Sequence, residues 1–382
     1  MINKLKYLII IIFNFISDYI TFKQKYFLFG NAYGDFSDNS RALFLYFFKQ
    51  NHYQDKIFFV LKNKKNYLEL RTTYPVVYYY SLKMILIVFQ SKYYFFTQGV
   101  SDIFFFKTKT TVAVNLWHGT PIKKIGYDSV IETKWIEEFK NKGIPLPYQS
   151  WDYFITGNTN INFLFQSAMK ISKDKLLSCG LPRNDNLYDI KNNNNLLLKE
   201  IALKITSFLH IQSNMEVILY APTFREINKI NFINTVELFL YEFQNNRETS
   251  TKILLLRLHP SDTALINKEL FSDKIIDASP YPNMQELLIY SDVLITDYSS
   301  SIFDYSILER PIIMYLFDYK DYLLSRGVYY NIEEEFLGYG ISYTIDDLMK
   351  KIKFSYKYTN ENFHKKFNMQ NASRNILKAL GL

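Results

Sequence analysis

The sequence contains a single cysteine, Cys179, among its 382 residues. One thiol excludes a disulfide framework and a zinc site built from cysteines, and it fits a reducing compartment. A long apolar run is also missing, because the run at residues 7–16 is shorter than the roughly 20 residues that a membrane-spanning helix requires. No Gly-x-x-x-x-Gly-Lys motif is present, so a P-loop for a magnesium nucleotide is not expected.

Glycine is scarce, with 12 residues, and its placement is therefore informative. Five glycines each close an apolar run in the first half of the chain: Gly30, Gly99, Gly119, Gly157 and Gly180. The stretches 38–50 and 81–91 have the length and spacing of helices. Repetition of strand, turn glycine and helix predicts an α/β fold with a parallel sheet wound on both faces.

The length of the chain predicts two domains, because single cores stop growing at about 250–300 residues. The asparagine-rich residues 191–195 have the composition of a linker. After them we expect strands at 216–221, 252–258, 274–277, 292–296 and 311–315, alternating with helices near 232–246, 261–270, 283–290 and 300–309. Residues 345–382 read as terminal helices.

Residues 1–20 have the pattern of an interfacial helix that lies on a membrane with Lys4 and Lys6 near the headgroups; a core helix is the alternative. No small-residue cleavage site follows, so a secretory signal is not expected. The formal charge of +8 favours an anionic partner, either a bilayer or a phosphorylated substrate. A nucleic acid is not expected as a partner, because the lysines are scattered and no nucleic-acid motif is present.

Residues 111–128 carry the first candidate site. An apolar strand stops at His118 and Gly119, and Thr120 is predicted to cap a helix with Pro121 at its first position. The free amides of that helix start, with two lysines nearby, favour an anion at the carboxyl end of the strand. His118 is a candidate acid, base or phosphate ligand; a structural histidine that fills a turn is the alternative.

Two further strand ends carry polar residues in the second half of the chain. One strand ends in Arg257, Leu258 and His259, directly before a proline. The other, at 293–296, is followed by Asp297 and by three serines at the start of a helix. Serines in this place are helix caps at minimum and a phosphate cradle at best.

These pieces together resemble the CDP-glycerol glycerophosphotransferase family of teichoic acid synthesis. The matching stretches are NLWHGTPIKKIGYD at 115–128, LYAPTFRE at 219–226, LRLHP at 256–260 and SDVLITDYSSSIFDYSILERPIIMY at 291–315. Two more, YFLFGNAYGDFSDNSRALFLY at 26–46 and RGVYYNIEEEFLG at 326–338, fit more loosely. The resemblance spans about residues 25–340 in the right order.

The resemblance implies a GT-B-like architecture, with two facing doubly wound, Rossmann-like domains and a cleft between them. We expect an interfacial helix at 1–20, an acceptor domain at 21–188, a CDP-donor domain at 189–344 and C-terminal helices at 345–382. The implied reaction transfers glycerol phosphate, or a related polyol phosphate, from CDP-glycerol or CDP-ribitol to a hydroxyl of a lipid-linked saccharide or polyol-phosphate acceptor. CMP is released, no cofactor is expected, and the enzyme would work peripherally on the anionic cytoplasmic face of the cell membrane.

In this reaction the acceptor hydroxyl must lose a proton, and a histidine suits that task. The resemblance places His118 at the general base, with phosphate binding as the alternative, and His259 at the donor phosphates. The predicted catalytic residues are therefore these two histidines. The predicted substrate-binding residues are Gly119, Thr120, Arg225, Arg257, Thr296, Asp297, Ser299, Ser300 and Asp304.

Three of these assignments have alternatives. Arg225 could bind a phosphate through two hydrogen bonds at once. Arg257 could bind the substrate, or it could instead be a surface charge at the sheet edge. Asp297 and Asp304 could hold a divalent ion, or they could orient the serines and the ribose; we favour the second role, and no metal is expected. A nucleotide-sugar glycosyltransferase of the same fold, acting in capsule or lipopolysaccharide synthesis, is the alternative function.

Overall fold

The computed structural model describes residues 23–142, 146, 150–211, 215–225 and 228–382. The interfacial helix predicted at residues 1–20 lies outside these ranges. The chain divides into two compact units. Unit 1 comprises Met1–His118, Thr133–Asp185 and Met369–Leu382, and unit 2 comprises Gly119–Glu132 and Asn186–Asn368.

Unit 1 is built on a seven-stranded parallel sheet with the strand order β3-β2-β1-β4-β5-β6-β7. Its strands are β1 (Tyr26–Phe29), β2 (Ile57–Leu61), β3 (Val76–Tyr78), β4 (Ser91–Phe96), β5 (Val112–Asn115), β6 (Tyr153–Thr156) and β7 (Leu176–Ser178). The helices around it are α2 (Asp38–Phe48), α3 (Lys64–Leu70), α4 (Leu82–Phe89), α5 (Val130–Asn141), α6 (Asn162–Met169) and α17 (Ala372–Ala379).

Aromatic rings fill one face of this sheet. Phe29 packs against Phe95 of the neighbouring strand at 5.0 Å and against Phe44 and Phe47 of α2 at 5.5 and 5.4 Å. Ile376 of α17 joins the same cluster, so the end of the chain returns to unit 1. Burying large rings stabilises a core strongly, and offset and edge-to-face pairs add to this.

Unit 2 is built on a six-stranded parallel sheet with the strand order β10-β9-β8-β11-β12-β13. Its strands are β8 (Glu216–Ala221), β9 (Lys252–Leu256), β10 (Ile275–Asp277), β11 (Val293–Thr296), β12 (Ile312–Tyr315) and β13 (Gly340–Ser342). Its helices are α7 (Asp185–Lys191), α8 (Asn195–Leu209), α9 (Lys229–Asn245), α10 (Pro260–Thr263), α11 (Met284–Tyr290), α12 (Ser301–Tyr305), α13 (Tyr319–Ser325), α14 (Ile332–Glu335), α15 (Ile345–Lys353) and α16 (Phe363–Phe367).

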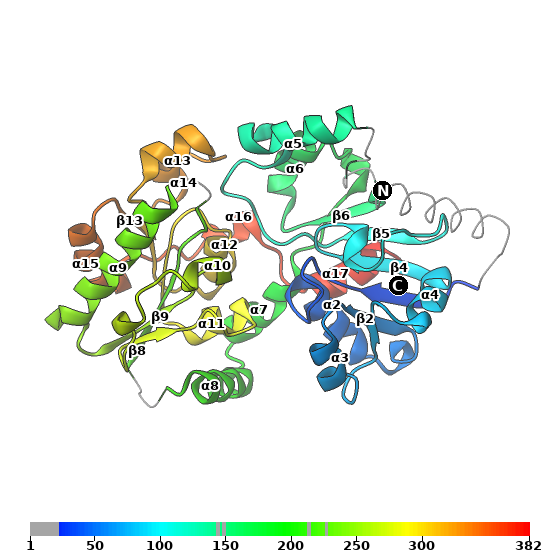
Figure 1. The fold of residues 1–382 in the computed structure, drawn as a ribbon, viewed down its shortest axis with the longest axis horizontal. Helices are drawn as coiled ribbons and strands as arrows, with labels where there is room; N and C mark the ends of the chain where they lie inside the picture. Colours follow the sequence, from blue (N-terminus) through cyan, green and yellow to red (C-terminus); the bar gives the residue numbers. More distant parts are fainter. Residues whose placement is uncertain (1–22, 143–145, 147–149, 212–214, 226–227) are drawn as a thin grey trace. The chain divides into compact units, whose positions relative to one another are not determined.

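The strands of unit 2 carry apolar residues on both faces, as strands buried in an α/β fold do. Helices α9 and α15 pack on one face around a cluster that includes Tyr220, Val236, Leu254 and Leu348. In Figure 1 these two helices lie on one side of the strands, and α11 and α12 lie on the other. Among the described residues, no helix is both long and apolar enough to cross a bilayer.

The order of strands reverses once in each sheet. In unit 1 the reversal falls between β1 and β4, and in unit 2 it falls between β8 and β11. Open α/β sheets bind ligands beside the carboxyl ends of the strands at this reversal, because the connections leave it in opposite directions. The polar residues that follow these strands are therefore the first place to look for a site.

Candidate active site

His118 lies just beyond the carboxyl end of β5, which pairs with β4 at the reversal in unit 1. Its side chain is exposed, although the strand before it is buried. The imidazole Nδ1 is 3.4 Å from the carbonyl oxygen of Thr97, which follows β4. The ring also lies 4.0 Å from that of Trp117. The predicted candidate therefore stands at the edge of the sheet, with its ring held from two sides.

The backbone that presents His118 is strained. Trp117 has φ +55°, a left-handed conformation that is rare for a bulky residue and costs about 1–3 kcal/mol. Two buried asparagines hold this turn. Asn39 donates from Nδ2 to the carbonyl of Trp117 at 2.9 Å, and Asn115 accepts the Trp117 N–H at 2.7 Å. Neither asparagine was among the predicted site residues.

A buried carboxylate holds the loop on which His118 rests. Asp102 accepts hydrogen bonds from the backbone N–H groups of Thr97 and Gln98 at 3.1 and 2.8 Å. Burial raises the pKa of Asp102, while these backbone hydrogen bonds oppose the shift. The carboxylate therefore fixes the direction of the Thr97 carbonyl, which in turn meets the imidazole.

The helix predicted at Thr120 is not present, and this prediction was wrong. Gly119 has φ +137°, and the chain then continues without regular structure to an antiparallel bridge between Lys123 and Val328. The next α-helix, α5, begins only at Val130. Thr120 is buried, and its hydroxyl has no hydrogen-bond partner within the ranges that the structure describes. No helix start therefore offers amides to an anion here.

Residues 119–132 are instead fastened to another segment of unit 2. The N–H of Lys124 donates to the carbonyl of Gly327 at 3.1 Å, and the Tyr329 hydroxyl donates to the carboxylate of Asp128 at 2.9 Å. Arg326 forms an ion pair with Glu132 at 2.9 Å. Backbone groups of this stretch are satisfied in the same way: the carbonyl of Ile122 accepts the N–H of Tyr329 at 2.8 Å, and the N–H of Ile125 donates to the Tyr329 hydroxyl at 3.3 Å. These contacts take the place of helical hydrogen bonds, which explains the failed helix prediction.

The second group of predicted residues meets at the carboxyl edge of the unit 2 sheet. His259 follows β9 and is exposed, and its ring lies 5.3 Å from that of Phe224, which follows β8. Ser299 and Ser300 follow β11 and are partly exposed. Because β9 and β11 lie on either side of β8, the ends of these two strands, which carry His259 and the two serines, are about 10 Å apart. That separation suits a ligand with two phosphates and a nucleoside.

Only one of the serines acts as a cap. The N–H of Ser301 donates to Ser299 Oγ at 3.2 Å, and the Ser301 hydroxyl lies 2.9 Å from the same oxygen. Ser300 occupies the N-cap position of α12 without a capping hydrogen bond from its side chain. The hydroxyl of Ser300 is thus the better placed of the two predicted serines to meet a ligand.

Arg225 is the centre of a buried ion cluster. Its Nη2 donates to Asp297 at 2.8 Å, its Nε donates to Asp318 at 2.7 Å, and its Nη1 donates to the carbonyl of Thr223 at 2.6 Å. Burial acts to lower the pKa of Arg225, but the two carboxylates raise it overall. The guanidinium is enclosed by the rings of Phe232, Tyr298, Phe317 and Tyr322. The predicted phosphate clamp by Arg225 stays a prediction, and its contacts favour a structural role.

The two predicted aspartates have separate partners. Asp297 also accepts the backbone N–H groups of Thr223 and Tyr298 at 2.8 and 2.7 Å, so it ties the loop after β8 to the loop after β11. Asp304, buried on α12, accepts from Gln285 of α11 at 3.0 Å. Among the described residues, no group of three His, Cys, Asp or Glu side chains is arranged to hold a metal ion.

Arg257 and Thr296 lie behind the edge of the sheet. Arg257 donates to the carbonyls of Ala278 and Tyr281, and burial lowers its pKa. Thr296 is buried, and its hydroxyl donates to the carbonyl of Ala221 at 2.6 Å. Arg257 is therefore engaged with a loop rather than free at the surface, and both side chains support the residues that face outward.

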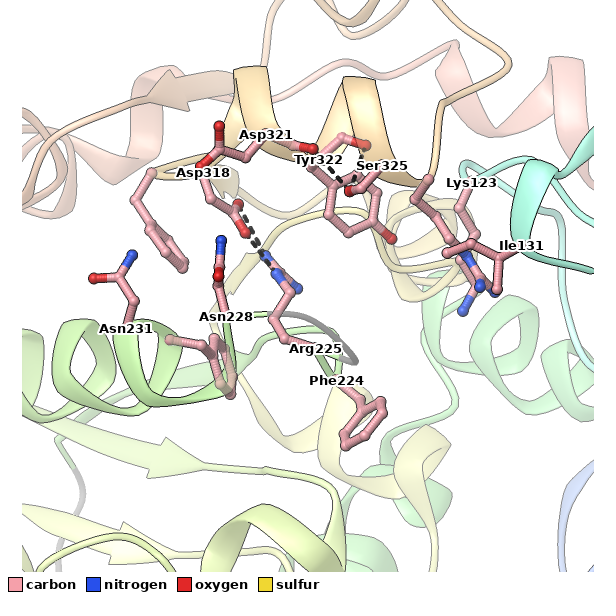
Figure 2. Close-up of a pocket in the computed structure, with 13 residues that line it drawn as sticks. Lys123, Ile131, Phe224, Arg225, Asn228, Asn231, Asp318, Asp321, Tyr322 and Ser325 are labelled. Atoms are coloured by element: carbon pink, nitrogen blue, oxygen red, sulfur yellow. Dashed lines mark hydrogen bonds and ion pairs between the residues drawn. The ribbon is translucent and has the colours of Figure 1, made fainter.

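A pocket opens beside the Arg225 cluster within unit 2. Figure 2 shows Arg225 pointing towards Asp318, with Asn231 on one side and Lys123 and Ile131 across the pocket. Asp318 was not among the predicted residues, although the sequence carries a signal for it. It lies three residues after strand β12, and Asp297 lies directly after β11. A second aspartate beyond a second parallel strand could have been read as the partner of Arg225.

Two Rossmann-like sheets, each with polar residues at the point of strand reversal, define a GT-B-like transferase. The wall teichoic acid polymerase TagF, in a structure soaked with CDPG, superposes with a TM-score of 0.76 at 25% identity, covering 96% of this chain and 90% of that one. Residues 12–378 match the family described as CDP-glycerol:poly(glycerophosphate) glycerophosphotransferase, and the chain belongs to this family.

Relatives in named organisms agree with this assignment. The chain is 31% identical to the teichoic acid glycerol-phosphate transferase of Staphylococcus aureus, over 79% of this chain and 77% of the relative. It is 30% identical to the teichoic acid glycerol-phosphate primase of Bacillus subtilis, over 78% and 75% of the two chains. The family resemblance and the GT-B-like fold inferred from sequence are thereby confirmed.

Proposed function

We propose that this protein transfers a polyol phosphate from a CDP-activated donor to a hydroxyl group of an acceptor in teichoic acid or capsule synthesis. The observation that carries the proposal is the family match over residues 12–378. In the reaction the acceptor oxygen forms a bond to the β-phosphorus of the donor, and the bond from that phosphorus to the CMP oxygen breaks. CMP leaves, and the hydroxyl proton passes to a base.

His118 is the proposed base. Its exposure beyond β5 supports the role, since the imidazole is accessible to a substrate hydroxyl while its backbone is held. Because the Thr97 carbonyl can only accept a hydrogen bond, its contact with Nδ1 favours the tautomer with hydrogen on that nitrogen. The Nε2 lone pair is then the one that takes the proton.

His259, Ser299 and Ser300 are the proposed donor-phosphate ligands. All three stand at the carboxyl edge of the unit 2 sheet, where parallel sheets bind phosphates and nucleotides. Asp297 and Asp304 orient the loops that carry them. Phosphoryl transfer depends mainly on positioning and on neutralising charge, so exposed donors on rigid strand ends are what the reaction requires.

The acceptor and the location of the enzyme extend the proposal. We infer a lipid-linked acceptor and a peripheral position on the cytoplasmic face of the membrane. Helix α4 supports this, because Leu82 and Leu86 are 83% and 63% exposed on one side of it, next to Tyr80 and Lys83. Exposed leucines flanked by tyrosine and lysine match the interfacial zone of a bilayer.

The test measures CMP release from CDP-glycerol and CDP-ribitol, and UDP release from UDP-sugars, with a short soluble acceptor. Turnover with a CDP-polyol supports the proposal, whereas turnover with UDP-sugars alone identifies a nucleotide-sugar glycosyltransferase and overturns it. His118→Ala is expected to lower kcat by about 10²-fold or more without changing the melting temperature. His259→Ala is expected to raise the donor KM. An unchanged kcat in the first variant would remove His118 from the role of base.

A further inference from the structure

We propose that Asn39 is a positioning residue for His118, which it serves by holding the backbone on which the imidazole stands. The inference rests on the proposed role of His118 as the general base. Asn39 lies in the first turn of α2, far from His118 in sequence, and its side chain is fully buried. It therefore cannot meet a substrate directly.

The amide of Asn39 is fixed by three contacts within unit 1. Its Nδ2 donates to the carbonyls of Leu116 and Trp117 at 3.3 and 2.9 Å, and its Oδ1 accepts the backbone N–H of Arg183 at 3.0 Å. Carbonyls accept and an N–H donates, so these partners allow only one orientation of the amide. The side chain thus clamps the two residues that precede His118.

The clamp acts on a residue whose backbone conformation is strained. Trp117 has φ +55°, and a tryptophan does not remain in the left-handed region unless its surroundings hold it there. Asn39 holds the carbonyl side of this residue, and Asn115 holds its N–H. Without the Asn39 contact, the peptide that joins Trp117 to His118 can rotate, and the imidazole turns with it.

Such a rotation also affects the proton on the imidazole. The contact between Nδ1 of His118 and the carbonyl of Thr97 is long, at 3.4 Å, so a small shift of the ring breaks it. The Nδ1–H tautomer, which leaves Nε2 to act as the base, then loses this hydrogen bond. Asn39 therefore sets both the direction and the tautomer of the base.

The first variant is Asn39→Asp, which keeps the size of the side chain but removes the donor that the two carbonyls require. We expect kcat to fall about 10- to 100-fold, with the donor KM changed less than about twofold. Asp38→Asn is the matched control, because it weakens the neighbouring ion pair to Arg183 at 2.9 Å and leaves the Asn39 clamp in place. If Asn39→Asp does not fold, Asn39→Ala, which buries no charge, takes its place.

Nitrogen-15 NMR of the imidazoles gives a readout that does not depend on activity. The chain has only five histidines, so the His118 signals can be assigned by substitution. We expect the Nδ1–H tautomer in the unaltered protein and in Asp38→Asn, and a mixture of tautomers in Asn39→Asp. The same tautomer in all three proteins would overturn the inference.

A double-mutant comparison completes the test. If Asn39 acts through His118, Asn39→Asp causes no further loss of CMP release in a His118→Ala background. The same fold loss in both backgrounds would show a separate structural effect and overturn the inference. A His118→Ala variant with normal kcat would instead contradict the proposed base, and the tautomer measurement would then decide the positioning role alone.

Discussion

His364 is the centre of a buried charge cluster in unit 2. Its Nε2 is 3.1 Å from the ammonium of Lys191, which forms an ion pair with Glu309 at 2.6 Å. Burial, together with the positive charges of Lys191 and Lys365, lowers the pKa of His364 to about 4, while Glu309 acts in the opposite direction. The folded protein therefore keeps this imidazole neutral at pH values where an exposed histidine is charged.

The free energy of unfolding should consequently depend on pH. In the unfolded chain a histidine has a pKa of about 6.5, so between pH 6.5 and 4 that chain binds a proton that the folded protein does not. The free energy of unfolding is therefore not reduced by His364 above about pH 6.5. It falls as the pH drops from about 6.5 to about 4, and the effect of His364 becomes constant below about pH 4. Urea unfolding of the unaltered protein and of His364→Gln should show a difference that follows this curve.

The control for this prediction is His210→Asn. His210 is exposed in the same unit, and asparagine tolerates its left-handed backbone. The control should keep the pH dependence of the unaltered protein. A parallel pair of curves for His364→Gln and the unaltered protein would contradict the assignment.

The polar residues that follow the strands could be predicted from the sequence, but the residues that hold them in place could not. His118, His259 and Ser300 are visible because each comes shortly after an apolar run that predicts a strand. Asn39 is not visible, because the residues that it holds lie 77 and 78 positions away in the chain. Asp102 holds residues only five and four positions before it, but no pattern in the sequence marks that contact. The role of Asn39 arises only when folding brings α2 next to the residues that follow β5.

At the scale of elements, the predicted strands of the second half are all present, with ends shifted by a few residues. Strands β2, β3 and β13 were not predicted; turn glycines mark the predicted strands of the first half, and neither β2 nor β3 ends in one. The helix predicted at 261–270 is broken, with only α10 and a short 3-10 turn formed. The predicted linker at 191–195 spans the end of α7 at Lys191, a turn at residues 192–194 and the start of α8 at Asn195.

Helix α17 begins with a cap that sequence alone does not reveal. Its own N-cap residue, Asn371, makes no capping hydrogen bond. The backbone N–H groups of Ala372 and Ser373 donate instead to the carboxylate of Asp185 at 2.7 and 3.0 Å. A carboxylate at a helix start accepts hydrogen bonds from the free amides and interacts favourably with the helix dipole, even when it comes from a distant segment.

Asp185→Ala should therefore destabilise unit 1 by about 1–2 kcal/mol, because two amides lose their acceptor and α17 loosens from the core. The measurement is urea unfolding followed by tryptophan fluorescence, since all three tryptophans of the chain, Trp117, Trp135 and Trp151, belong to unit 1. Asp189→Ala is the control, an exposed aspartate on the same helix. Equal losses in both variants would mean that the carboxylate of Asp185 does not cap α17.

At the scale of the whole molecule, the proposed membrane location requires one surface of unit 1 to contact the bilayer. Leu82 and Leu86 lie one helical turn apart on α4 and are largely exposed, and Lys83 lies 4.7 Å over the ring of Phe58. The leucines would insert at the headgroup boundary, and each lysine near anionic lipid would add about 1 kcal/mol. Salt should weaken the contribution of the lysines and leave the contribution of the leucines unchanged.

Replacing Leu82 and Leu86 together by glutamine should lower binding of the full chain to anionic vesicles about tenfold, because about 1.4 kcal/mol of apolar transfer is lost. Sedimentation with vesicles at low and high salt measures this, and CMP release with a soluble acceptor should remain unchanged. Leu203→Gln is the control, since Leu203 on α8 is 71% exposed but belongs to unit 2. Deleting residues 2–18 should weaken vesicle binding further if the predicted interfacial helix is an anchor, whereas insoluble protein would identify that segment as part of the core. Equal binding by the leucine variant and the unaltered protein would place the membrane contact elsewhere on the molecule.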